Sequence, residues 1–180
     1  AKPTAEPVST PAARTAGEPA PAMLSGTDLP MLRMDRLSSR YIIGGHYEQN
    51  PVLDNDTIRR GDIRSVTFLP TLENMGENAW DVSALKNGAI MAWTIPNGDL
   101  QDLYIAGEGG VKLNRDCTEL FSGYRNMVSI DFNGCVDFSS NTRMRGMFNG
   151  CTKLKHLDLS TLDTSRVTDM CDMFDGCYNL

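Results

Sequence analysis

Short runs of β-branched and aromatic residues, separated by turn signals, mark the middle of the chain. An Asn-Gly pair, Asn97 and Gly98, follows the second run, and a glycine-rich stretch follows the third. Asn-Gly is a preferred two-residue turn of β-hairpins. The pattern therefore predicts a small, mainly antiparallel β element within residues 37–112, with Asn97 and Gly98 near the connection between its last two strands. The runs with strand composition lie at 63–69, 89–95 and 103–106.

The C-terminal third repeats itself. Segments 136–154 and 162–180 align at an offset of 26 residues, and nine of their nineteen positions are identical. A weaker copy, at an offset of 27, relates 120–132 to 147–159. The matches fall on apolar and turn residues. A fixed period of 20 to 50 residues is typical of stacked-repeat architectures.

One half of each repeat predicts a strand. In Leu154-x-x-Leu157-x-Leu159 the alternation places Leu157 and Leu159 in the interior and the intervening side chains outside. Successive strands should then stack in parallel, each burying the face of its neighbour. Exposed polar residues on such a rigid scaffold are candidates for ligand contact. The predicted binding residues on this outward face are Ser129, Asp131, Asn133, His156, Asp158 and Ser160.

The other half of the repeat predicts a short helix. Residues 163–170 have the composition of a capped turn leading into it, with Thr164 or Ser165 as cap. The apolar residues then recur at helical spacing, and Gly176 is placed to end the helix. The expected buried stripe consists of Val167, Met170, Met173 and Phe174.

Residues 1–36 form a separate zone. Six of the nine prolines fall in the first thirty residues, among Ala, Thr, Ser and Glu. Such a segment cannot bury enough apolar surface to offset its ordering entropy, so it predicts a disordered, extended tether. The net charge of -6 and the lack of a basic run argue against a nucleic-acid partner. No apolar stretch approaches the roughly 20 residues of a transmembrane helix.

The five cysteines do not form a metal-binding or ordinary disulfide pattern. Buried thiols are the favoured interpretation, and a bridge between Cys151 and Cys177 is the alternative. The aspartates that recur with the repeat raise the possibility of a calcium ladder, but single carboxylates per repeat favour backbone capping. No cluster of nucleophile, base and pocket residues is present, so we expect no enzyme activity, no cofactor and no metal.

The repeat resembles a known family. Met-Phe-x-Gly-Cys-x-x-Leu, starting at Met147, and Leu-x-Leu-Ser-x-x-Asp-Thr-Ser-x-Val-Thr-Asp-Met, starting at Leu157, are similar to the BspA-like leucine-rich repeats of bacterial surface proteins. Together with the β-rich stretch before it, the resemblance covers about two thirds of the chain. It implies an extracellular or cell-surface location, a role in adhesion, and no catalytic residues.

Taken together, the sequence predicts an α/β leucine-rich-repeat solenoid of short parallel strands and short helices at 113–180, C-terminally incomplete. A small β-rich domain at 37–112 and the disordered tether at 1–36 precede it. The expected function is adhesion to an extracellular or host protein through the outward strand face. The alternative is a structural spacer of a larger surface protein, with no ligand of its own.

Overall fold

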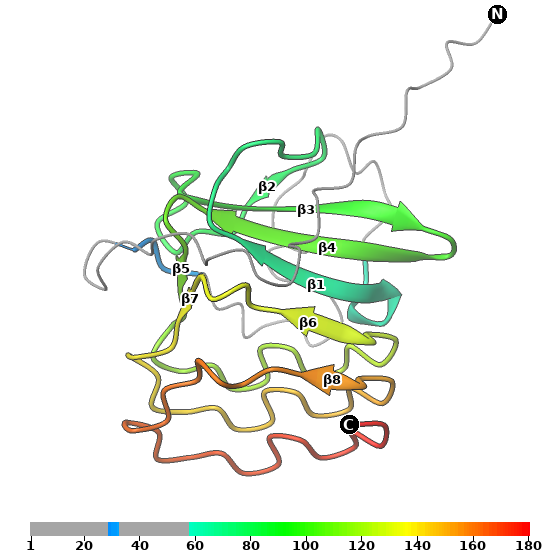
Figure 1. Ribbon diagram of the computed structural model, residues 1–180, viewed down its shortest axis with the longest axis vertical. Helices are drawn as coiled ribbons and strands as arrows, with labels where there is room; N and C mark the ends of the chain where they lie inside the picture. Colours follow the sequence, from blue (N-terminus) through cyan, green and yellow to red (C-terminus); the bar gives the residue numbers. More distant parts are fainter. Residues whose placement is uncertain (1–28, 33–57) are drawn as a thin grey trace, which may run out of the picture.

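The computed structural model describes residues 29–32 and 58–180 (Figure 1). Within these residues the fold is β-rich, and the single helical segment is the short 3-10 helix η1. No helix in the described ranges is long and apolar enough to span a membrane. The elements are η1 (Arg60–Asp62), β1 (Ile63–Leu69), β2 (Trp80–Asp81), β3 (Ile90–Asn97), β4 (Leu100–Gly107), β5 (Val111–Lys112), β6 (Ser129–Asp131), β7 (Val136–Asp137) and β8 (His156–Leu157).

A mixed six-stranded sheet in the order β2-β3-β4-β1-β6-β8 organises the molecule. Strands β3 and β4 are antiparallel and are joined at Gly98 and Asp99, with φ +64° at Gly98, so the predicted hairpin is confirmed. Strand β1, however, is parallel to β4 and also to β6. It therefore lies between the hairpin and the repeats and is not part of an antiparallel unit.

The strands β1, β6 and β8 are parallel neighbours in the large sheet, and each is here called a rung. Strand β1 is the first rung, although it precedes the repeats in the sequence. Ser65 is the register partner of Ser129, which in turn is the partner of His156. The inward residues follow the same register, with Val66 beside Ile130 and Ile130 beside Leu157. Figure 1 shows β6 and β8 stacked in order beneath β1. The hairpin β3–β4 comes between the first and second rungs in the sequence, but in the sheet it lies on the other side of β1 from β6, with β2 at the edge.

Each repeat forms one coil with three sides. The first side is the rung in the large sheet, and the second contains the parallel pair β5 and β7. The third side is held by single bridges from Asp116 to Arg143 and from Arg143 to Asp169. The chain returns to an equivalent place after 26 or 27 residues, and there Thr142 N donates to Arg115 O and Thr168 N to Thr142 O, both at 2.8 Å.

The predicted short helix at 163–176 is wrong. The segment is a string of tight turns in which Met173 N donates to Met170 O and Asp175 N to Asp172 O, each three residues back. Positive φ values recur every four residues along this side of each coil, which a right-handed helix cannot accommodate. In the two preceding coils, other N–H groups of the equivalent segments donate to the next coil, as from Phe148 N to Met173 O at 2.9 Å, and not four residues back along their own coil. The positive-φ positions are Glu119, Gly123, Gly146, Gly150, Asp172 and Gly176.

The turn strings still bury their apolar residues at helical spacing. Met144, Met147, Phe148 and Cys151 are fully buried, a pattern of i, i+3, i+4 and i+7. The equivalent positions in the next coil are less covered: Met173 is buried, whereas Met170 and Phe174 are exposed. The helical spacing of buried residues is thus present in the preceding coil, but of the expected stripe only Met173 is buried: Val167 is half-buried, and Met170 and Phe174 are exposed.

One apolar core runs through the described residues from Leu32 to Met173. An aromatic stack starts within this core and ends at the exposed Phe174. The Phe121 and Phe148 ring centroids are 5.6 Å apart and those of Phe148 and Phe174 5.8 Å apart, and both ring pairs are nearly parallel. Trp93, fully buried, belongs to a second cluster on the opposite side of the sheet. Because the core and the sheet continue across residues 112 and 113, the β-rich part and the repeats pack as one body.

Four residues of the predicted tether take part in the fold. Leu29 and Leu32 are buried, and Leu32 N donates to Lys112 O at 2.8 Å. The tether therefore does not extend over residues 29–32. The rest of segment 1–36 lies outside the described residues.

We expect Phe148→Ala to lower the free energy of unfolding by about 3–5 kcal/mol, because it removes a fully buried ring from the middle of the aromatic stack. Phe174→Ala is the matched control, since that ring is 39% exposed and stacks on one side only. Its loss should be about 1–2 kcal/mol. Urea denaturation followed by circular dichroism measures both, and equal losses would contradict the stacked core.

Candidate functional site

The outward side of the three rungs forms a polar surface, here called the strand face and defined by Ser65, Thr67, Ser129, Asp131, His156 and Asp158. Ser129, Asp131, His156 and Asp158 are exposed, while the inward Val66 and Ile130 are buried. The structure brings Ser129 and His156 together as register partners on adjacent strands. Asn133 and Ser160 follow the ends of β6 and β8, at the next corner of the coil.

The recurring aspartates hold the corners of the coils. A carboxylate oxygen of Asp131 accepts the N–H of Asn133, and one of Asp158 accepts the N–H of Ser160, both at 2.8 Å. The hydrogen bonds from Ser160 lower the pKa of Asp158. The sequence interpretation of these residues as backbone caps is therefore confirmed. The same two-residue cap occurs at Asp116, Asp137, Asp163 and Asp169.

Asn133 also has a structural role. It adopts φ +50°, a conformation that asparagine tolerates better than most residues, and its Nδ2 donates to Phe68 O at 2.7 Å. This bond ties the end of β6 to the end of β1. Of the six predicted binding residues, Ser129, His156 and Ser160 therefore remain as the side chains that do not hold the backbone of another residue in place. Among the described residues, no group of three or more His, Cys, Asp or Glu side chains could hold a metal ion.

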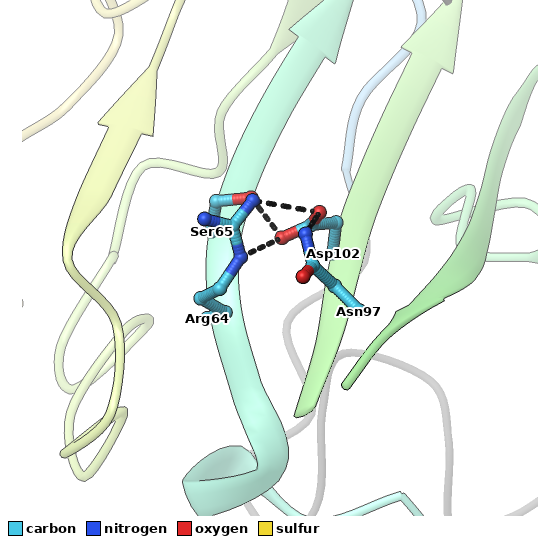
Figure 2. Close-up of polar contacts among 4 residues, drawn as sticks. All are labelled: Arg64, Ser65, Asn97 and Asp102. Atoms are coloured by element: carbon cyan, nitrogen blue, oxygen red, sulfur yellow. Dashed lines mark hydrogen bonds and ion pairs between the residues drawn. The ribbon is translucent and has the colours of Figure 1, made fainter. Parts of the chain in front are cut away.

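A partly buried ion pair that the sequence analysis missed supports the start of the strand face (Figure 2). Arg64 Nε and Nη2 donate to the two carboxylate oxygens of Asp102, both at 2.9 Å. Ser65 Oγ donates to the same carboxylate at 2.6 Å, and Asn97 Nδ2 does so at 2.8 Å. Asp102 is only 6% exposed, whereas the Arg64 side chain is 40% exposed.

The electrostatics of this cluster follow from those contacts. Burial by itself would raise the pKa of Asp102, but the hydrogen bonds from Arg64, Ser65 and Asn97 outweigh it and lower the pKa. A register shift between Ile63 and Ser65 accompanies the contact of Arg64 with Asp102 on the outer side of the sheet. Little in the sequence pointed to this ion pair, because Arg64 and Asp102 are 38 residues apart and belong to different strands.

On the outer side of the sheet, the part formed by β3 and β4 is covered by other residues of the chain. The Trp93 and Tyr104 rings stack there with centroids 5.5 Å apart. The loop after β1 covers them, and a Cβ added at Gly76 would lie 2.8 Å from Trp93 Cδ1. The accessible part of the surface is therefore the rungs β1, β6 and β8.

Two of the three rungs of this surface, β6 and β8, lie in a segment that matches a known family. Residues 115–180 match the family described as Mycoplasma protein of unknown function, DUF285. That family is generally related to leucine-rich-repeat-like surface proteins. No curated protein and no solved structure matches the chain. The DUF285 segment contains β6, β7 and β8, whereas β1 and the Arg64–Asp102 pair precede it.

The cysteines are free thiols and most are shielded. Burial raises the pKa of Cys117 and of Cys151 to about 12, with the charges of Asp116 and Cys177 adding to the effect. Cys151 Sγ donates to Phe121 O and Cys177 Sγ to Phe148 O, each at 3.1 Å. The interpretation as buried thiols is confirmed for Cys117, Cys135 and Cys151, whereas Cys171 is exposed.

We expect Asp102→Asn to lower the free energy of unfolding at pH 7 by about 1–2 kcal/mol, because the half-exposed Arg64 loses its ionic partner. Since the pKa of Asp102 is lower in the folded than in the unfolded chain, this stabilisation is present above pH 4. It is lost as the pH falls through the folded-state pKa. Urea denaturation from pH 7 to pH 2.5 should show the difference between wild type and variant shrinking. Asp99→Asn, in the exposed turn, should show no such difference; a pH-independent gap at Asp102 would argue against the charged pair.

Thiol labelling tests the burial of the cysteines in the DUF285 segment. At pH 8 iodoacetamide should modify Cys171 first, because it is exposed, and Cys177 more slowly. Cys117, Cys135 and Cys151 should stay unmodified until the protein is denatured in urea. Peptide mass spectrometry measures the order, and early labelling of Cys151 would contradict its packing against Phe121.

Proposed function

We propose that this chain is an extracellular or cell-surface interaction module whose strand face binds a host or neighbouring-cell macromolecule. The observation that supports it most is the pair Ser129 and His156, both exposed and adjacent in register on strands whose other side is buried. Such side chains require little ordering when a partner binds, because the sheet already fixes their positions.

The similarity to surface proteins supports the proposed location. The DUF285 match covers the repeats, and the repeat motif resembles BspA-like leucine-rich repeats of bacterial surface proteins. The proposal assigns the chain no catalytic step, no cofactor and no nucleic-acid partner. Its partner is an extracellular or host protein or another polymer exposed at a cell surface.

The test is binding of the purified full chain to host cells and to a panel of extracellular-matrix proteins. The variant Ser129→Ala/His156→Ala removes the exposed pair without touching a corner cap, whereas changing Asp158 would free the N–H of Ser160. Two contact side chains worth about 1 kcal/mol each should weaken binding roughly tenfold or more.

The matched control is Ser139→Ala/Arg115→Ala, which changes two exposed side chains on other sides of the coil. It should bind as the wild type does. Binding that survives in the Ser129→Ala/His156→Ala variant would place the site elsewhere on the molecule. A folded wild type that binds neither cells nor matrix proteins would favour the spacer over the binding module.

A further inference from the structure

The start of the three rungs carries a concentration of basic side chains. Here it is called the basic corner and is defined by the exposed side chains of Arg59, Arg125, Lys153, Lys155 and His156. In the segments that build it, 59–65, 125–129 and 151–156, the only acidic residue is Asp62. The Asp62 carboxylate accepts the N–H of Arg59 at 2.8 Å.

Backbone contacts bring the three segments together. Asn126 Nδ2 donates to Gly61 O at 2.7 Å, and the Arg125 side chain lies against Gly61. Thr152 Oγ1 donates to Arg125 O at 2.9 Å, which places the next coil beside the first. Lys155 N donates to Val128 O, and Val128 N donates to Arg64 O. The cations therefore follow one another along the axis of the stack, on neighbouring coils.

The opposite end of the second and third rungs is acidic. Asp131 ends β6 and Asp158 follows β8, and segments 131–136 and 158–162 contain no lysine or arginine. Adjacent rungs are about 4.8 Å apart, whereas the two ends of one rung are separated by about 10 Å, close to the Debye length at physiological salt. The positive charges on neighbouring coils therefore reinforce one another locally, although the chain as a whole has a net charge of -6.

We propose that the basic corner binds an acidic polysaccharide, a linear polymer that carries sulfate or carboxylate groups, running along the axis of the stack. This rests on the proposed function, because it names the partner of the same surface, with His156 shared between the two. Arg64 is engaged by Asp102, which leaves Arg125, Lys153 and Lys155 as the principal anion contacts. Thr152 and Ser129 supply hydroxyl groups beside them.

The composition of the corner favours a polysaccharide over other polyanions. A protein partner would be anchored by aromatic or apolar side chains near the centre of the interface, and the exposed residues of these segments are polar. Single-stranded nucleic acid would stack its bases on aromatic rings, and the one aromatic-type side chain exposed in the corner is the imidazole of His156. A sugar polymer needs only charge and hydroxyl contacts of the kind present.

The experiment measures binding of the full chain to fluorescently labelled heparin by anisotropy, at a series of salt concentrations. The variant Arg125→Gln/Lys153→Gln/Lys155→Gln should weaken binding at least about tenfold and lower the slope of log Kd against log salt by about three. Arg115→Gln/Arg143→Gln/Arg166→Gln changes the net charge equally at exposed positions outside the corner. It should keep the wild-type affinity within about threefold.

Two further comparisons keep the result decisive. The charge-conserving variant Arg125→Lys/Lys153→Arg/Lys155→Arg should bind heparin as the wild type does, and all variants should unfold cooperatively with heat. Equal weakening by both Gln triples, no saturable binding of heparin by the folded wild type, or tighter binding of single-stranded DNA than of heparin would each overturn the proposal. These outcomes leave the cell-binding test of Ser129 and His156 unaffected, so the two proposals can fail separately.

Discussion

Hydrogen bonds between coils are the interaction on which the rest of the structure depends. Along the turn strings, Phe121 N donates to Met147 O at 2.8 Å and Phe148 N donates to Met173 O at 2.9 Å. Without a helix, the backbone N–H groups of these segments have no partner four residues back. Each one left buried and unpaired would lower the free energy of unfolding by about 1–3 kcal/mol. Each coil is therefore stable only against its neighbours, which is why the repeats stack.

The same stacking builds the surface. The aspartates that cap the corners, such as Asp131 and Asp158, recur because every coil must turn at the same place. The rungs between the corners carry Ser129 and His156 on their outer side, while the residues on their inner side, such as Ile130, pack into the core. At the other end of the rungs, lysine and arginine side chains from three coils gather, and Asp62 is the only acidic residue in the segments that carry them. The strand face and the basic corner both arise because successive coils stack in the same register.

Particular residues were enough to predict the parallel rungs and the hairpin. The 26-residue period and the alternation around Leu157 predicted the parallel rungs, and Asn97 with Gly98 predicted the β3–β4 hairpin. The helix was wrong because buried residues at i, i+3, i+4 and i+7 are produced equally by a string of tight turns, as at Met144, Met147, Phe148 and Cys151. Glycine or a polar residue at every fourth position, as at Gly146 and Gly150, was the signal against a helix.

The repeat, the inward and outward residues of the rungs, and the capping role of the aspartates follow from the amino-acid pattern alone, because they depend on local periodicity and on contacts two residues apart. The place of β1 in the ladder, the pairing of Arg64 with Asp102, and the shared corner of Arg125, Lys153 and Lys155 became evident only in the folded chain. These contacts join residues about 30 to 65 positions apart, and they depend on the order and register of strands in the sheet. Local patterns do not encode that order, since each rung can form the same backbone hydrogen bonds with any neighbour of similar pattern.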